Sequence, residues 1–274
     1  MMKFSPIGVF DSGYGGLTIL KEIKKQLPQY DYLYLGDNAR TPYGTRSYET
    51  VYQYAKECVE WMFKQNCPLV ILACNTASAK ALRTIQQNDL PKVSAEKRVL
   101  GVIRPTSEII GDFTQSQHIG ILGTKGTVQS ESYLIEIGNF FPGIKIFQQA
   151  CPLWVPLVEN NEQETKGAEF FIEKDIQALL KKSPEIDTIL LACTHYPLLI
   201  EKIKKYLPSG IKVISQGEIV AKSLANYLNR HAEIERKCSK TASIKFFTTD
   251  AVKDFDKHST AFFGERVSSI HVDL

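Results

Sequence analysis

The sequence predicts an α/β protein whose sheets are mainly parallel. Short apolar runs alternate with segments of helical periodicity along almost all of the 274 residues. The runs are rich in Val, Ile and Leu without alternating polar residues, which is typical of strands covered on both faces. Strand–helix alternation of this kind favours parallel sheets joined by right-handed crossovers. A loose internal repeat adds a second expectation: two pseudo-equivalent α/β domains, with the active site in the cleft between them.

The first hundred residues predict strands and helices in alternation. Strands are expected at 7–10, 32–35, 69–73 and 98–103, where the apolar runs lie. Helices are expected at 16–27, 47–65 and 77–87, where apolar residues recur at helical spacing.

The rest of the chain continues this pattern after a polar break. Strands are expected at 118–123, 144–149, 187–192, 211–215 and 243–247, and an apolar segment at 266–272 closes the chain. Helices are expected from the turn after 123 to about 140, near 163–182, at 198–207 and near 217–229.

Composition and charge argue against several classes of function. The net charge is only +3, and the lysine clusters lie on the polar faces of predicted helices, so nucleic acid is not expected as the primary partner. No apolar run is long enough to span a bilayer, and the N-terminal segment lacks the apolar block of a signal peptide. The six cysteines form no C-x-x-C pair and the histidines are scattered, so no metal site is expected. We expect a cytoplasmic protein without a membrane partner.

The internal repeat places a cysteine at equivalent points of two halves. "GVFDSGYGG" (8–16) and "GILGTKGTV" (120–128) each open a half with an apolar run and a Gly-containing turn. Each is followed by an apolar run that ends in Leu-Ala-Cys, "VILACNTAS" (70–78) and "ILLACTHYP" (189–197). Both cysteines therefore come where a predicted strand ends and a helical segment begins.

These positions favour chemistry on a small anion. Asp11, Cys74 and Cys193 follow predicted strands, so they are expected at the carboxyl edges of the sheets, where helix N-termini attract anions and lower the pKa of a thiol. Two thiols that face each other across a cleft suit inversion of a stereocentre, because one can remove a proton while the other supplies one. Short donors for substrate carboxylates are available nearby: Ser12, Asn75, Thr76 and Thr194.

The same residues leave other interpretations open. Cys193 with His195 as its base would also suit a cysteine hydrolase or transferase, although the second cysteine motif would then have no explanation. A binding protein for an amino acid would not need both thiols. The four other cysteines, Cys58, Cys67, Cys151 and Cys238, are expected to be buried thiols of the core.

Four motifs in order resemble those of the bacterial glutamate racemases, in the aspartate/glutamate racemase family. They are "FDSGYGG" (10–16), "GDNARTPYG" (36–44), "ACNTAS" (73–78) and "ACTHYPLL" (192–199). The resemblance implies cofactor-independent interconversion of L- and D-glutamate, which supplies D-glutamate for peptidoglycan, in a homodimer. An aspartate or related amino-acid racemase is the nearest enzymatic alternative.

The resemblance also implies roles for individual residues. The catalytic residues would be Cys74 and Cys193, assisted by Asp11, His195 and Glu159. The substrate-binding residues would be Asp11, Ser12, Tyr43, Gly44, Asn75, Thr76, Thr124, Thr127, Thr194 and His195. The first α/β domain would comprise residues 1–99 plus 216–274, and the second residues 100–215.

Three positions depart from the pattern of this family. Arg104 stands where a smaller residue is expected, Ala192 where glycine is commoner, and "SQGEIV" (215–220) differs from the Ser-Gly/Ala pattern at the return to the first domain. None coincides with a predicted catalytic residue. The roles of Arg104 and of the 215–220 crossover stay open on the sequence alone.

Overall fold

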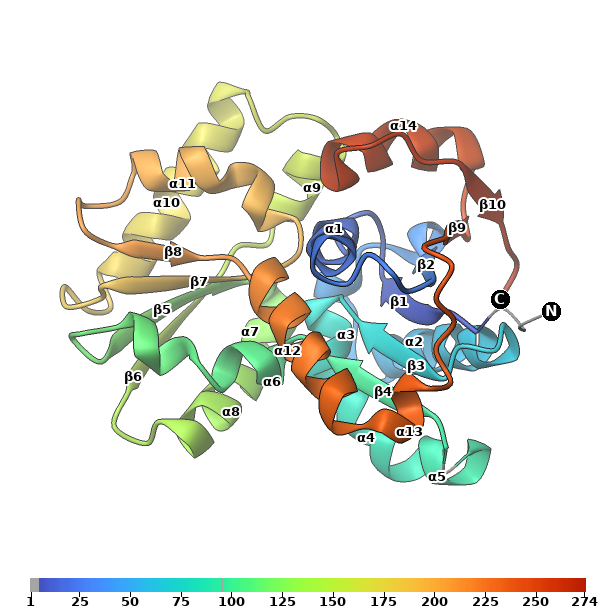
Figure 1. The fold of residues 1–274 in the computed structure, drawn as a ribbon. Coiled ribbons are helices and arrows are strands. Elements are labelled where there is room, and N and C mark those ends of the chain that lie inside the picture. The colour runs from blue at the N-terminus through green and yellow to red at the C-terminus, as the bar shows by residue number, and fades with distance from the viewer. Residues whose placement is uncertain (1–4, 95) are drawn as a thin grey trace.

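A computed structural model of the chain describes residues 5–94 and 96–274 and contains two separate parallel sheets. Figure 1 shows the smaller sheet on the left and the larger one on the right, with α12 (Gly217–Arg230) beginning between them. The predicted α/β class with mainly parallel sheets is confirmed, since every strand pairing is parallel.

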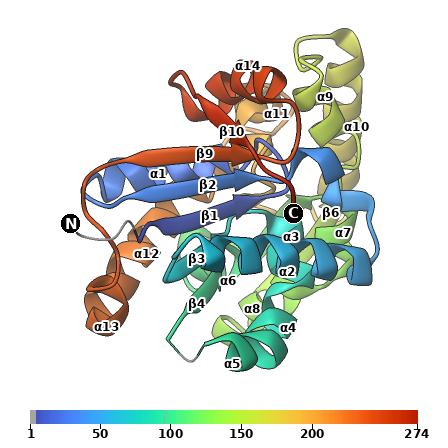
Figure 2. The same ribbon diagram turned by 90° about the vertical axis from the view of Figure 1, so that its right-hand side faces the viewer.

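The larger sheet has the strand order β10-β9-β2-β1-β3-β4. Its strands are β1 (Ile7–Asp11), β2 (Tyr32–Gly36), β3 (Leu69–Leu72), β4 (Arg98–Gly101), β9 (Ile244–Thr248) and β10 (Ser269–His271). The end of the chain thus returns to the sheet in which the chain begins, and β9 runs alongside β2 in the same direction (Figure 2).

The smaller sheet has the strand order β6-β5-β7-β8. Its strands are β5 (His118–Gly123), β6 (Lys145–Ala150), β7 (Thr188–Ala192) and β8 (Lys212–Ile214). In both sheets the central strands are buried along their whole length, which explains why these runs carry almost no polar side chains.

Helices cover both faces of the larger sheet. Because successive strand residues point to opposite faces, β1 contributes side chains to the core on each side. Ile7 and Val9 of β1 pack in the same cluster as α1 (Leu17–Gln26), α12 and α14 (Val252–Phe263). Phe10 packs on the other face with α2 (Tyr48–Lys64) and α3 (Asn75–Lys80).

The smaller sheet is covered in the same way. Leu191 packs with α10 (Lys166–Leu180) and α11 (Ile200–Lys205), whereas Leu190 packs with α6 (Ile103–Ser107) and α8 (Ser132–Phe140). The shorter elements are η1 (Asn38–Arg40), η2 (Tyr43–Thr45), η4 (Ile110–Phe113), η5 (Tyr196–Leu199) and α13 (Ala232–Glu235). Over the described part of the chain, no helix combines the length and the apolar character that crossing a membrane requires.

Several helices differ from the sequence-based expectation. The helix expected at 77–87 is divided into α3, α4 (Leu82–Thr84), a π-helical segment η3 (Ile85–Asp89) and α5 (Leu90–Val93). Pro91 has no N–H for the helical ladder, which favours a wider turn before it. The helix expected up to residue 140 is two helices, α7 (Lys125–Gln129) and α8, because Glu131 has a φ of 55°. Neither α9 (Trp154–Glu159), which contains a proline, nor α14 was predicted from the sequence.

The chain crosses between the two sheets twice. The first connection follows β4, all of which pairs with β3, so the predicted boundary after residue 99 falls inside a strand of the larger sheet. The second connection runs from β8 to α12, where the predicted boundary after residue 215 lies. The division into 1–99 plus 216–274 and 100–215 stays a prediction.

Candidate active site

The carboxyl ends of neighbouring strands from both sheets converge on one site. In the larger sheet, β1 ends at Asp11, and Cys74 lies two residues beyond the end of the adjacent β3. In the smaller sheet, Thr124 follows β5 and Cys193 follows the adjacent β7. The parallel topology therefore gathers residues from distant parts of the sequence at the edges where α/β proteins bind ligands.

A cavity of about 70 Å³ between these strand ends collects most of the predicted site residues. They are Ser12, Tyr43, Gly44, Cys74, Asn75, Thr76, Thr124, Cys193, Thr194 and His195. Asp11, Thr127 and Glu159 are not among the lining residues, but each hydrogen-bonds to one that is. The remaining lining residues were not predicted: Thr41, Pro42, Thr45, Lys125, Pro152, Val155 and Pro156.

Cys74 caps the N-terminus of α3 and is only 6% exposed. Its Sγ accepts a hydrogen bond from the Ala77 N–H at 3.4 Å and lies 3.5 Å from Ser12 Oγ. Burial and the charge of Asp11 nevertheless raise the pKa of the Cys74 thiol to about 12, against the lowering by the Ser12 and Ala77 contacts. The expectation that the helix terminus makes this thiol acidic is therefore wrong for Cys74, because burial and the charge of Asp11 outweigh its two hydrogen-bond contacts.

Cys193 has a different environment from Cys74. Its Sγ lies 4.0 Å from His195 Nδ1, and His195 Nε2 lies 3.0 Å from Glu159 Oε1. Burial lowers the pKa of His195, but the contacts with Cys193 and Glu159 outweigh it and raise this pKa to about 10. A histidine that keeps its proton near neutral pH stabilises a thiolate beside it, so the Cys193 side of the cavity suits a base.

Asp11 is fully buried behind the cavity and connects the two halves. Its Oδ1 accepts from the Gly13 N–H at 2.9 Å, and its Oδ2 accepts from the Thr194 hydroxyl at 3.4 Å. Burial raises the pKa of Asp11, while the charge of His195 opposes that change. Asp11 thus orients Thr194 and sets the field at Cys74 without facing the cavity itself.

A cluster of three threonine hydroxyls closes another side of the cavity. Thr76 Oγ1, from the larger-sheet half, lies 2.9 Å from Thr124 Oγ1, which also donates to Thr127 Oγ1 at 3.1 Å. Thr124 caps α7 by accepting from the Thr127 N–H at 3.2 Å. These hydroxyls can turn toward a carboxylate in the cavity, since a hydroxyl both donates and accepts.

The Tyr43–Gly44 turn is held by a buried polar network behind it. The Tyr43 hydroxyl donates to Asp37 Oδ2, and Arg40 Nε donates to the same oxygen at 2.7 Å. A Cβ on Gly44 would lie 2.9 Å from Thr124 Cβ, so the close approach of the two halves here requires glycine.

Three residues that support the site were missed by the sequence reading. Gln216 and Tyr133 both hydrogen-bond to the side chain of Asn75, and Phe262 of α14 packs edge-on against His195 with ring centroids 5.2 Å apart. The unusual "SQGEIV" segment marked the position of Gln216 without indicating its contacts. Nothing in the local sequence points to Tyr133 or Phe262, because their contacts depend on how the two halves pack.

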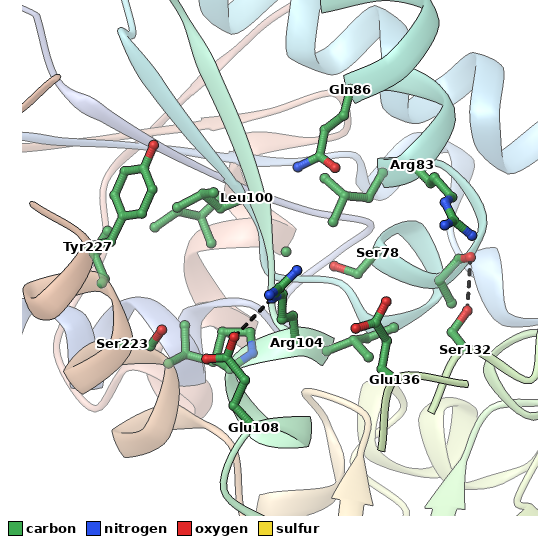
Figure 3. A pocket seen from close by; sticks show the side chains of 18 of the residues that line it. Ser78, Arg83, Gln86, Leu100, Arg104, Glu108, Ser132, Glu136, Ser223 and Tyr227 are labelled. Carbon is green, nitrogen blue, oxygen red and sulfur yellow. Dashed lines mark hydrogen bonds and ion pairs between the residues drawn. The ribbon is translucent and has the colours of Figure 1, made fainter. Parts of the chain in front are cut away.

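A larger cavity of about 690 Å³ lies at the junction of α4, α6, α8 and α12 (Figure 3). Arg104, whose role the sequence left open, lies on its wall and donates from Nε to Glu108 Oε1 at 2.9 Å. On another wall, the Ser132 hydroxyl donates to the Ala79 carbonyl at 3.2 Å. The described residues that line this cavity include none of the predicted site residues.

Within residues 5–94 and 96–274, no group of His, Cys, Asp and Glu is arranged to hold a metal ion.

Comparison with known proteins places the chain in one family. The model of the Asp/Glu/Hydantoin racemase family matches residues 7–224. The glutamate racemase of Geobacter metallireducens is 36% identical over 271 residues, which cover 98% of this chain and 97% of that protein.

Solved structures agree with this similarity over the whole fold. A glutamate racemase isoform from Bacillus anthracis superposes with a TM-score of 0.89 at 36% identity, covering 99% of this chain and 98% of that one. The Francisella tularensis glutamate racemase in complex with D-glutamate gives a TM-score of 0.87 at 29% identity, with 99% and 98% coverage. The chain therefore belongs to the Asp/Glu/Hydantoin racemase family and is an amino-acid racemase.

Proposed function

We propose that the protein interconverts L- and D-glutamate with two cysteines, Cys74 and Cys193, one of which removes the α-proton while the other gives its own proton to the opposite face, without a cofactor. The observation that carries this proposal is that both thiols line one small cavity and come from opposite halves of the molecule. Glutamate as the substrate is supported by the similarity to glutamate racemases along the full chain, one of them in complex with D-glutamate.

The two environments suggest which thiol carries the proton at rest. Cys193, beside His195, would be the base that removes the α-proton from one face of the substrate. Cys74, whose pKa is raised, would be the thiol that gives its proton to the opposite face. After one turnover Cys193 holds a proton and Cys74 is the thiolate, which is the state needed for the other enantiomer.

The remaining residues would bind the substrate and stabilise the carbanion. Loss of the α-proton moves negative charge into the α-carboxylate, where hydrogen-bond donors stabilise it most. Thr76 and Thr194 offer hydroxyls, and Ser12 and the Tyr43–Gly44 turn complete the cavity wall. Asp11 would hold Thr194 in place, and Glu159 would hold His195.

The proposal extends to the setting of the reaction. D-Glutamate formed here would supply peptidoglycan synthesis in the cytoplasm, and the active species would be a homodimer. The peptidoglycan role and the homodimer follow from the resemblance to bacterial glutamate racemases, and all three points stay predictions.

One observation favours a second candidate. The side chains of Cys193, His195 and Glu159 contact one another in sequence, as a nucleophilic cysteine, its base and an orienting carboxylate would. A hydrolase or transferase would use these three side chains alone and would leave Cys74 in the same cavity without a role.

Isotope exchange separates these functions. The protein is incubated with L-glutamate in deuterated water without added cofactor, and chirality and α-deuterium are measured together. We expect D-glutamate that carries deuterium at the α-carbon. Turnover of aspartate alone would indicate an aspartate racemase, and the absence of exchange on both amino acids would reject the proposal.

Replacement of each cysteine tests the two-thiol mechanism. We expect Cys74→Ala and Cys193→Ala each to lower kcat by at least about a thousandfold, since each direction of reaction needs both an acid and a base. Cys238→Ala, at a buried thiol outside the cavity, is the control and should retain activity. Full activity in either of the first two variants would exclude this mechanism.

A further inference from the structure

A buried ring of three hydrogen bonds links Asn75 to two residues outside the proposed catalytic set. Asn75 Nδ2 donates to Gln216 Oε1 at 2.8 Å, and Gln216 Nε2 donates to the Tyr133 hydroxyl at 2.8 Å. The Tyr133 hydroxyl donates to Asn75 Oδ1 at 2.5 Å. Within this set each side chain donates to one member and accepts from the other, so the Asn75–Gln216–Tyr133 ring closes on itself.

The ring joins three parts of the chain that are far apart in sequence. Asn75 begins α3 next to Cys74, Tyr133 belongs to α8 on the smaller sheet, and Gln216 immediately precedes α12. Gln216 therefore lies on the second connection between the two sheets, just before α12, which begins between them in Figure 1.

Gln216 also contacts the first connection between the sheets. Its Nε2 donates to the Val102 carbonyl at 3.1 Å, and Val102 lies between β4 and α6. The Thr106 hydroxyl lies 3.0 Å from the same nitrogen. One amide thus links both chain connections to a residue of the active-site cavity.

Burial of the ring means that its hydrogen bonds determine the orientation of the Asn75 side chain. Asn75, Gln216 and Tyr133 are 2%, 3% and 0% exposed, so water cannot replace a lost partner. With both ends of its amide held, Asn75 has one orientation, and the first turn of α3 with Cys74 is fixed relative to the smaller sheet.

We propose that Gln216 is a positioning residue that holds Asn75 and Cys74 in place and keeps the two halves closed over the cavity. This inference rests on the proposed function only for its kinetic consequence. The structural consequence, a closed cavity with two protected thiols, is measurable without substrate.

The first experiment measures thiol protection by mass spectrometry during alkylation of the native protein. Cys74 and Cys193 are each 6% exposed, whereas Cys58 and Cys67 are fully buried in the core and report global unfolding. In Gln216→Met and Tyr133→Phe we expect Cys74 and Cys193 to react about tenfold faster, with Cys58 and Cys67 unchanged. Thr106→Val is the matched control, because it removes a partner of Gln216 Nε2 and leaves the ring intact.

The second experiment uses steady-state kinetics with glutamate. We expect Gln216→Met and Tyr133→Phe each to lower kcat/KM about tenfold. The double variant should have a kcat/KM no lower than that of the poorer single variant, because both substitutions act through one ring. Gln216→Glu keeps the volume and the acceptor for Asn75 but loses the donor, and should behave like Gln216→Met. Thr106→Val should keep kcat/KM within about twofold of the parent.

The outcomes distinguish the two proposals. Lack of racemisation by the parent protein would reject the glutamate assignment, while the alkylation pattern would still test the ring. Unchanged thiol protection in both variants would overturn the positioning role, and so would equal acceleration at Cys58 and Cys67, which would indicate a loss of global stability alone. Additive losses of kcat/KM in the double variant would also overturn it.

Discussion

At the scale of single residues, the two thiols differ because their neighbours differ. Cys74 is surrounded by buried neutral groups and by Asp11, all of which favour the thiol except for two hydrogen-bond donors. Cys193 faces His195, whose pKa is raised against the effect of burial by the contacts with Cys193 itself and with Glu159 on its far side. Two cysteines at equivalent positions of a repeat thus have different surroundings, as the proposed division into acid and base requires.

The contact between His195 and Glu159 predicts a pH effect. In Glu159→Gln only the contact with Cys193 still opposes the lowering by burial, so the pKa of His195 should fall below about 10. The imidazolium is present below its pKa and is lost as the pH rises through it, so the variant should lose the charged form at lower pH. NMR titration of the ring measures this directly, and kcat near pH 8 should fall about tenfold.

A second carboxylate–histidine contact provides the control for this prediction. Glu185 lies 3.2 Å from His118 Nδ1 in the same half of the molecule, away from the cavity. Glu185→Gln should leave the titration of His195 and kcat unchanged. An unaltered His195 titration in Glu159→Gln would contradict the role assigned to Glu159.

At the scale of elements, the loop between β1 and α1 packs closely against Thr194 and His195 of the site. A Cβ on Gly15 would clash with Thr194 Oγ1 and would lie 2.5 Å from His195 Nδ1. Both side chains are held by further hydrogen bonds, to Asp11 and Glu159, so neither can move aside without losing a partner.

Gly15→Ala should therefore disturb catalysis more than folding. We expect kcat to fall about a hundredfold, because a displacement near 1 Å at reacting groups has effects of this size. Gly138→Ala is the control, since a Cβ at that position of α8 would have no atom within 4 Å other than its chain neighbours and the backbone of its own helix. It should retain activity and gain about 0.5–1 kcal/mol of stability from helix propensity. Equal activity of the two variants would show that the loop does not fix Thr194 and His195.

Some elements of the fold could be predicted from the sequence alone and others could not. The strands were predictable because both faces of each sheet are covered, which leaves continuous apolar runs such as those of β1 and β7. The cysteines at the strand ends were recognisable for the same reason, since each follows such a run. The breaks at Glu131 and near Pro91 depend on local backbone geometry that periodicity does not encode. Gln216 and Phe262 reach the site only through tertiary packing, which no local pattern reports.

At the scale of the whole molecule, the end of the chain returns to the first sheet and is anchored there by Asp31. Its Oδ1 accepts hydrogen bonds from the N–H and hydroxyl groups of both Thr241 and Ser243. These contacts align β9 beside β2, where the Tyr32 N–H donates to the Ser243 carbonyl at 2.8 Å. The segment that carries α14, and with it Phe262 against His195, therefore depends on this anchor.

The anchor predicts a dependence of global stability on pH. Burial raises the pKa of Asp31, but its hydrogen bonds outweigh that effect and lower it from 3.8 to about 2. A carboxyl whose pKa is depressed by folding stabilises the fold at pH values above 3.8, and this contribution is lost as the pH falls toward 2. Asp31→Asn should therefore lower the free energy of unfolding by about 2 kcal/mol near neutral pH.

Urea denaturation at a series of pH values measures this contribution. The difference between the parent and Asp31→Asn should be constant above pH 3.8 and should shrink below it, because the parent then loses the same charge that the variant lacks. Asp273→Asn, at a fully exposed carboxylate, should leave stability nearly unchanged at every pH. A difference that persists undiminished in acid would mean that Asp31 acts through its shape rather than its charge.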